Sequence, residues 1–173
     1  GNYSGVSTGN NFSNAEANLQ SPNVSTRVRG LSGADLTRDF FPTDIGLDSY
    51  NTERVDISRG ANAILFGLGS PAGIINNQLK VPNLRKNGIT FQQTYSRYDS
   101  HREVLDVNQS IIKDRLGIRI IGLNDDKKFR QKPAFEDDRR LYAALRWEPR
   151  LFRDGFTQLN VSYENGDISA NGP

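Results

Sequence analysis

The chain has 173 residues, and its 22 basic and 20 acidic side chains give a formal net charge of +2. This near balance argues against a general nucleic-acid binder, and the absence of cysteine excludes a disulfide framework and a thiolate metal site. No apolar run approaches the roughly 18 residues that a membrane helix needs, although β-strands that cross a membrane look polar on average.

The first 82 residues predict short strands separated by turns. Residues 1–23 are rich in Asn, Ser and Gly and are expected to form a loop. Short strands are predicted over residues 24–29, 36–40 and 55–58. Short helical turns are expected near residues 14–19 and 49–53. The chain lacks methionine and a signal-peptide pattern, which predicts a piece of a longer or processed protein.

Residues 53–80 are the most informative segment of this first part. They join two β-type runs through a turn region that holds Gly60, Gly67, Gly69 and Gly73. Such a density of glycine indicates a backbone that turns tightly several times. The segment lacks a Gly-Lys-Ser/Thr ending and no helical pattern follows it, so nucleotide binding is not predicted.

After Pro82 the sequence alternates between polar and apolar residues in five segments. Their apolar positions are expected to share one face, and they include Ile89, Phe91, Tyr95, Leu105, Val107, Ile118, Ile120, Leu141, Leu145, Trp147, Leu159 and Tyr163. The opposite face carries Asp106, Asn108, Arg115, Arg119, Arg140 and Arg146. Strands of about 8–12 residues suit a tilted crossing of a bilayer.

The connections between these strands are unequal in length. Lys113 and Asp114 predict a tight hairpin turn, residues 149–155 a compact polar turn, and residues 124–137 a longer, highly charged loop. This pattern fits a barrel with short turns at one rim and long loops at the other. A soluble antiparallel sandwich with one wet face explains the alternation equally well, so both remain open at this point.

Enzymatic chemistry finds no support in the sequence. The single histidine, His101, lies in a predicted turn and cannot form a catalytic triad or a histidine cluster. Acidic residues such as Asp125, Asp126, Asp137 and Asp138 lie in a charged stretch, where a solvated surface is the usual explanation. No catalytic residue, metal site or cofactor is therefore predicted.

Four motifs in the first part resemble the plug domain of TonB-dependent outer-membrane receptors. They are Val28-Arg-Gly30, the run Glu53-Arg-Val-Asp-Ile-Ser-Arg-Gly60, Ile64-Leu-Phe-Gly67, and Ser70-Pro-Ala-Gly-Ile-Ile-Asn76 followed by Lys80. Ala61 and Ala72 depart from the family pattern, which usually has Pro and Gly there. The region after Pro82 resembles the start of a siderophore-receptor barrel, with cues such as Ser96-Arg-Tyr-Asp99 and Ala144-Leu-Arg-Trp-Glu-Pro149.

The resemblance implies a plug domain of the α+β class over residues 1–82, with a small mixed sheet and short helices. Antiparallel transmembrane β-barrel strands would follow over residues 83–173, as an incomplete barrel of about five strands. The implied function is energy-coupled uptake of a scarce nutrient, foremost a ferric siderophore, across the outer membrane of a Gram-negative-type bacterium. The implied partners are the TonB energy-transducing protein, the siderophore and outer-membrane lipid, without nucleic acid.

The resemblance also assigns roles to single residues. Arg29 and Arg59 match plug arginines that pair with barrel glutamates, and Glu53 belongs to the same plug–barrel latch. Gly30, Gly60, Gly67, Gly69 and Gly73 would shape the turns of the plug. The plainer interpretation of both arginines is that they are exposed edge-strand charges.

Six aromatic residues carry further expectations. Phe40, Phe41 and Tyr50 either lie near apical loops that contact a ligand or pack in the core. Tyr95, Trp147 and Tyr163 are expected near strand ends, as an interfacial aromatic belt. The competing hypothesis for the whole chain is a soluble or surface-attached β-rich domain that binds a ligand such as a glycan and has no transport role.

Overall fold

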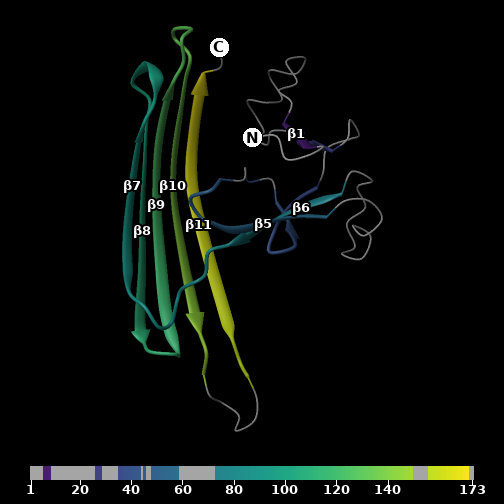
Figure 1. The fold of residues 1–173 in the computed structure, drawn as a ribbon, viewed down its shortest axis with the longest axis vertical. Helices are drawn as coiled ribbons and strands as arrows, with labels where there is room; N and C mark the ends of the chain where they lie inside the picture. Colours follow the sequence, from purple (N-terminus) through teal and green to yellow (C-terminus); the bar gives the residue numbers. More distant parts are fainter. Residues whose placement is uncertain are drawn as a thin grey trace. The chain divides into compact units, whose positions relative to one another are not determined.

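The computed structural model describes residues 6–8, 26–28, 35–43, 45, 48–58, 73–149 and 156–171, and nearly all its regular structure is β-strand (Figure 1). The chain divides into two compact units, residues 1–79 and residues 80–173. Within the described ranges the one helical element is the 3-10 turn Arg97–Asp99, and none of these residues belongs to a helix that is long and apolar enough to cross a membrane.

The first unit contains a two-stranded and a four-stranded sheet. Strand β1 (Val6–Thr8) pairs antiparallel with β2 (Thr26–Val28). The prediction of a loop was therefore wrong at β1, because a three-residue strand is too short to show a period and exists only through its distant partner. The helical turn expected at 14–19 lies outside the described residues.

The four-stranded sheet has the order β4-β3-β6-β5 and mixes parallel and antiparallel pairs. Its strands are β3 (Asp35–Arg38), β4 (Phe41–Pro42), β5 (Thr52–Ser58) and β6 (Ile74–Leu79). The helical turn expected at 49–53 is absent, since β5 already begins at Thr52. The strand expected across 36–40 is instead a hairpin, whose two central residues, Asp39 and Phe40, both have positive φ as a two-residue hairpin loop requires.

The core of this sheet combines apolar and polar side chains. Tyr50, Ile74 and Ile75 are buried, as are Thr37 and Asn76. The Asn76 Oδ1 atom accepts hydrogen bonds from Thr37 Oγ1 at 3.0 Å and from the backbone N–H of Phe40 at 2.7 Å.

Gly73 is the residue from which the chain enters β6. It is buried and has a φ of 106°, a backbone conformation that side chains disfavour and glycine accepts. The other four turn glycines, at positions 30, 60, 67 and 69, lie outside the described residues.

The second unit contains a five-stranded antiparallel sheet in which sequence neighbours pair side by side (Figure 1). The strands are β7 (Gly88–Tyr95), β8 (His101–Ile112), β9 (Leu116–Lys128), β10 (Phe135–Trp147) and β11 (Leu159–Asn171). Each alternating segment found in the sequence coincides for most of its length with one of these strands, although Arg115 lies in the hairpin turn before β9.

The charged stretch 124–137 is mostly strand, so the prediction of a long loop there was wrong. Strand β9 continues to Lys128 and β10 starts at Phe135, which leaves residues 129–134 as the loop. Lys127 lies directly opposite Glu136, and their side chains form an ion pair at 2.7 Å. Because such pairs neutralise charge across the ladder, a highly charged sequence can continue as strand.

The two faces of this sheet differ in chemistry. We call the face that carries Ile89, Val107, Ile120 and Ala143 the outer face, since these residues lie directly opposite one another on successive strands. All twelve apolar residues predicted to share a face lie on it. Tyr163 is not near a strand end as expected, because β11 extends to Asn171 and places Tyr163 in its interior.

Candidate functional site: a charged inner face and a cleft at its end

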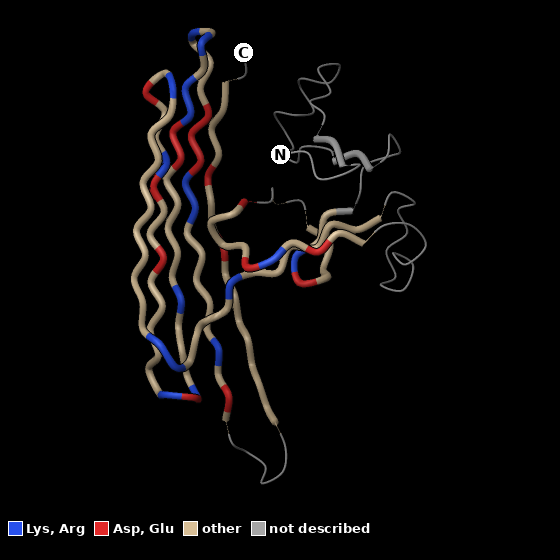
Figure 2. Tube along the Cα trace, viewed as in Figure 1, with Lys and Arg blue, Asp and Glu red and all other residues tan. Residues whose placement is uncertain are grey.

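The opposite face of the sheet, here called the inner face, carries paired charges from β8, β9 and β10. Figure 2 shows acidic and basic residues along these strands. Asp125 of β9 lies directly opposite Arg102 on one side and Asp138 on the other. Both aspartates are only 4% exposed. Like charges directly opposite each other destabilise a sheet, so this row depends on its cations.

The cations come from the row of Asp125 and Asp138 itself and from the rows on either side of it. Arg102 Nη1 lies 2.6 Å from Asp125 Oδ2, and Lys127 Nζ lies 3.6 Å from the same oxygen. Arg140 donates two hydrogen bonds of 2.7 Å, one to each oxygen of Asp138. The fork of the guanidinium matches the carboxylate, and such bidentate, charge-assisted bonds are the strong ones.

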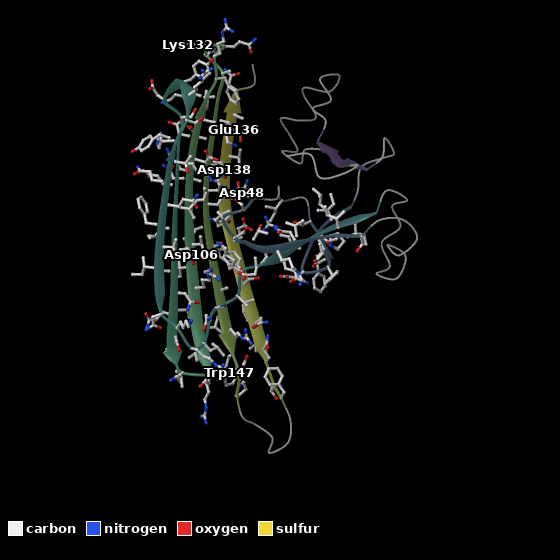
Figure 3. All side chains as sticks on the ribbon, viewed as in Figure 1. Asp48, Asp106, Lys132, Glu136, Asp138 and Trp147 are labelled. Carbon is white, nitrogen blue, oxygen red and sulfur yellow. The ribbon has the colours of Figure 1, made fainter. Side chains whose placement is uncertain are left out.

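A second ionic cluster lies farther along the inner face and centres on Asp106 of β8, which Figure 3 labels together with Asp138. Arg119 donates a hydrogen bond of 2.8 Å to each oxygen of Asp106, and Lys80 Nζ lies 3.2 Å from Oδ2. The sequence placed Asp106, Arg119 and Arg140 on a polar face, but gave no pairing between them.

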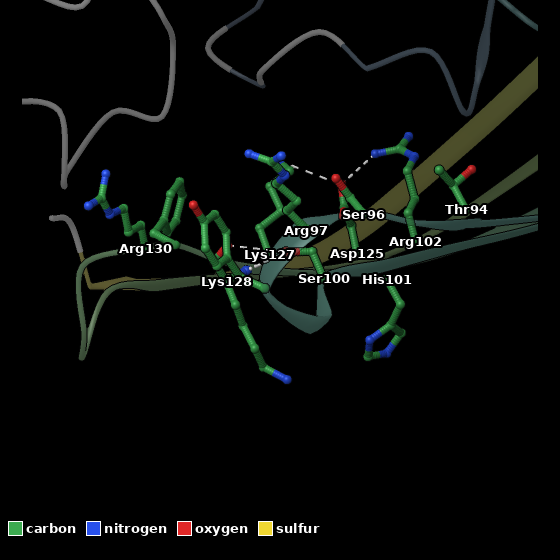
Figure 4. Close-up of a pocket in the computed structure, with 12 residues that line it drawn as sticks. Thr94, Ser96, Arg97, Ser100, His101, Arg102, Asp125, Lys127, Lys128 and Arg130 are labelled. Carbon is green, nitrogen blue, oxygen red and sulfur yellow. Dashed lines mark hydrogen bonds and ion pairs between the residues drawn. The ribbon is translucent and has the colours of Figure 1, made fainter.

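A cleft of about 500 Å³ opens where the β7–β8 turn meets the end of β9 and the loop that follows it (Figure 4). Five of its lining residues are Arg or Lys and one is Asp, and the lining includes the aromatic side chains of Tyr98 and Phe129. The residues that matter here are Arg97, Tyr98, Arg102, Lys127, Phe129 and Arg130. His101 and Arg102 point to opposite sides of the strand, and Arg102 points to the side of Asp125 (Figure 4).

The turn at this cleft has unusual backbone geometry. Tyr98 and Asp99 have φ values of 63° and 61°, in the left-handed region that residues other than glycine rarely adopt. Such conformations cluster at binding sites, where the surrounding structure holds them. Sequence reasoning gave this turn no role, and its side-chain pattern alone carries no signal of the backbone conformation.

Lys127 lines the cleft and belongs to the inner face. At its level of the sheet the outer face is no longer apolar, since the strand neighbours Asp126 and Lys128 are charged. Burial alone would lower the pKa of its ammonium group. The hydrogen bond from Lys127 to Glu136 and the nearby carboxylates of Asp125 and Asp138 outweigh burial and raise that pKa above its ordinary value. Lys127 is therefore a permanent cation of the cleft at physiological pH.

The residues that the sequence singled out are only partly described. Arg29 and Arg59 lie outside the described residues, and Glu53 is an exposed residue of β5. Phe40 and Phe41 are 44% and 76% exposed at the β3–β4 hairpin, whereas Tyr50 is 2% exposed and belongs to the core. Within the described ranges, no group of three or more His, Asp or Glu side chains is arranged to hold a metal ion.

This chain is similar to part of a TonB-dependent siderophore receptor. The features that agree with this class are the paired charges on one face of the second sheet, the apolar residues on its other face and the mixed sheet of the first unit. No family model matches the chain. The ferrichrome outer membrane transporter and phage receptor of Escherichia coli K12 is 29% identical over 121 residues, which cover 69% of this chain and 16% of that protein.

Solved receptor structures share the fold. The ferric-catecholate import receptor Fiu of Escherichia coli K12 superimposes with a TM-score of 0.72 at 18% identity, over 86% of this chain and 20% of Fiu. The pyoverdine receptor FpvA of Pseudomonas aeruginosa gives 0.67 at 20% identity, over 83% and 22% of the two chains. The ferric preacinetobactin receptor BauA of Acinetobacter baumannii gives 0.69 at 18%, over 83% and 22%.

The chain thus spans about a fifth of the length of the proteins that it matches. Those proteins are named as transporters and receptors and none as an enzyme, in agreement with the prediction that this chain is not an enzyme. The resemblance to this class of receptor is confirmed by both kinds of comparison.

The charged row yields a stability prediction for Arg140→Met in the full-length protein. The side chains of Arg140 and Asp138 are 7% and 5% exposed, so the variant leaves Asp138 buried and without its bidentate cation. We expect the free energy of unfolding to fall by about 3 kcal/mol, the usual cost of removing one partner of a buried pair. Denaturant titration of the protein in lipid or detergent measures it.

Arg139→Met is the matched control, because Arg139 is the next residue and is exposed on the outer face. Adding Asp138→Asn to the Arg140→Met variant is expected to recover part of the loss, since the neutral amide no longer needs a cation. Equal losses for the two single variants would show that the ion pair does not support the sheet.

Proposed function

We propose that this chain is part of a TonB-dependent receptor that takes up a ferric siderophore across the outer membrane. Residues 1–82 would form most of the plug domain and residues 83–173 the first strands of the barrel wall. The division into compact units between Leu79 and Lys80 supports a boundary in this region. The observation that carries the proposal is the five-stranded sheet with an exposed apolar face and a charged opposite face.

The apolar outer face has the composition of a lipid contact. Along β10 its apolar residues run from Trp147 to Leu141. Outer-membrane barrels present an apolar band of this kind to lipid. Ile89 and Phe91 of β7 are 75% and 61% exposed, which is unfavourable in water and favourable in lipid. Beyond Leu141 the outer face becomes charged at Arg139 and Asp137.

The charged inner face suits the lumen of such a barrel. The bidentate pairs of Arg119 with Asp106 and of Arg140 with Asp138 neutralise carboxylates that apolar packing would not tolerate. A lumen also needs a polar wall against which a plug can move. Polar and ionic contacts determine how two surfaces dock, but they stabilise the docked state less than a hydrophobic core does.

The ligand is proposed to be an anionic ferric chelate. Arg97 and Arg130 line the cleft beside the aromatic rings of Tyr98 and Phe129. Guanidinium groups bind carboxylate and phenolate oxygens, and aromatic faces stack on planar ligand groups. The exposed Phe40 and Phe41 at the β3–β4 hairpin of the first unit are further candidates for ligand contact.

Energy for uptake would come from the TonB energy-transducing protein, which pulls on the plug. We propose that Arg29, Arg59 and Glu53 form a latch between the plug and the barrel. Arginine suits this role because its fork makes directional, charge-assisted bonds that hold a surface without burying apolar area. Gly30, Gly60, Gly67, Gly69 and Gly73 would let the plug backbone turn.

Transport of radiolabelled ferric siderophores into cells tests the function directly. A strain that lacks the full-length receptor is expected to lose uptake of one siderophore class under iron limitation and to regain it when the gene is restored. A strain that lacks TonB is expected to bind that siderophore at the surface without importing it. Uptake that is equal with and without the receptor, for every siderophore supplied, would rule out the proposed function.

The cleft predicts the charge preference of the receptor. Arg97→Glu/Arg130→Glu is expected to weaken binding of an anionic ferric chelate by more than about tenfold, because each reversal replaces an attraction of order 1 kcal/mol by a repulsion. Binding of a neutral ferric chelate is expected to change less. Fluorescence titration of the purified receptor measures both affinities.

Lys113→Glu/Arg115→Glu makes the same change of charge in the exposed hairpin turn between β8 and β9 and serves as the control. If it weakens binding as much as the cleft variant, the effect reflects net charge and the cleft has no special role.

The latch predicts a transport defect for Arg59→Ala in the full-length receptor. Loss of the guanidinium is expected to lower siderophore uptake several-fold and to make the plug easier to unfold, while surface binding persists. Arg54→Ala is the control, since Arg54 is an exposed arginine of β5 that pairs with Asp56 on its own strand at 3.0 Å. Unchanged uptake together with unchanged plug stability would contradict the latch.

A further inference from the structure

Residues 80–87, which we call the strap, connect β6 to β7 and lie against the inner face of the second unit. The strap forms no strand or helix, yet Pro82 and Leu84 within it are buried. Segments without regular structure usually run over the surface, because their backbone polar groups need partners. The inner face supplies those partners from side chains.

Two neighbouring inner-face residues of β8 bind the middle of the strap. Asn108 Oδ1 accepts a hydrogen bond from the backbone N–H of Asn83 at 2.8 Å. Its Nδ2 donates to the carbonyl oxygens of Asn83 at 3.0 Å and Lys86 at 2.6 Å. Ser110 Oγ donates to the carbonyl oxygen of Leu84 at 2.6 Å. All of these hydrogen bonds go to backbone atoms of the strap, and none of them involves a side chain of the strap.

The start of the strap is bound in the same way by β8, β9 and β10. Tyr142 Oη donates to the Lys80 carbonyl oxygen at 2.9 Å, and Arg119 Nη1 donates to the Val81 carbonyl oxygen at 3.2 Å. Lys80 Nζ pairs with Asp106 at 3.2 Å. The Asp106 cluster thus anchors the residue at which the second unit begins.

The strap also packs closely on the sheet at Gly117. A Cβ atom at this position would lie 3.0 Å from Leu84 Cδ2 and 3.2 Å from Pro82 Cβ, closer than side chains normally approach. Glycine at 117 therefore makes room for the strap. Gly122 in the same strand has no atom near its would-be Cβ, so glycine there is not required by packing.

In the described part of the first unit, two buried asparagines lack the kind of hydrogen bonds that hold the strap. The side chains of Asn51 and Asn77 are 0% exposed, and none of their amide nitrogen or oxygen atoms has a hydrogen-bond partner. Buried polar groups that lack partners cost stability. When force is applied to the first unit, its sheet is therefore expected to yield before the strap, whose backbone is held at several points in succession.

We propose that the strap is a mechanical stop, which limits how much of the chain leaves the barrel when the first unit is pulled. The proposal rests on the proposed function, because it takes the first unit as the plug on which TonB pulls. Unfolding of the first unit would release the chain as far as Lys80 and halt there. The strap would keep the plug's end in register, so that the plug can refold against the wall after each cycle.

Force spectroscopy on the full-length receptor in a lipid bilayer, pulled from its N-terminus, tests this stop. The native chain is expected to show a last distinct force peak at a released length that ends at Lys80. In Asn108→Ala/Ser110→Ala this peak is expected to fall, and the released length before the next barrier is expected to grow by about 28 Å, the extended length of eight residues.

Two matched controls separate the strap from general weakening of the sheet. Gln109→Ala changes the residue between the two anchors, which is exposed on the outer face, and is expected to leave peak and length unchanged. Gly117→Ala is expected to weaken the stop as the double variant does, whereas Gly122→Ala is expected to leave it intact. Resistance of the folded barrel to SDS confirms that each variant is folded before it is pulled.

The stop is disproved if the native chain is released past Asn87 without a barrier, or if the double variant keeps the native force and length. Siderophore uptake by the same proteins is measured separately. A receptor that imports no siderophore but shows the barrier at Lys80 would overturn the proposed function and support the stop. A receptor that imports normally and shows no barrier would overturn the stop alone.

Discussion

Antiparallel pairing in a fixed register is the constraint on which the second unit depends. Because successive side chains of a strand point to opposite faces, a slip of one residue would move the paired charges to the outer face and the exposed apolar residues to the inner one. The paired rows of β8, β9 and β10 show why the register is held. Arg102, Asp125 and Asp138 lie in one row, and this alignment of β8 with β9 places Arg102 directly opposite Asp125.

The same alternation gives the inner face a second task. Asp106, Asn108 and Ser110 follow each other at every second position of β8, so that all three reach the strap from one side. The inner face of the sheet therefore carries both the ion pairs and the side chains that bind the backbone of the strap. A lipid-facing sheet with an apolar inner face would have no means to hold an irregular segment, since the backbone of that segment would lose its hydrogen bonds.

Part of this arrangement was predictable from local patterns. Alternation located all five strands, and the spaced motifs from Val28 to Lys80 were enough to indicate the class of receptor. The charged stretch around Lys127 and Glu136 was wrongly predicted as a loop, because a local pattern of charges does not reveal an opposite strand that neutralises it. The αL conformations at Asp39, Phe40, Tyr98 and Asp99 were likewise missed, since side-chain periodicity says nothing about backbone φ.

The sequence by itself determined that the chain is rich in β-strand and how the strand residues of the second unit divide between two faces, because a period of two is a property of neighbouring residues. It also indicated the kind of receptor, through motifs that occur along the chain in the same order as in the receptor family. Only the tertiary structure decided which charges pair, where the cleft opens, and why residue 117 is glycine. These features join residues that are far apart along the chain, as Tyr142 and Lys80 are, and only the register of the folded sheet brings them into contact.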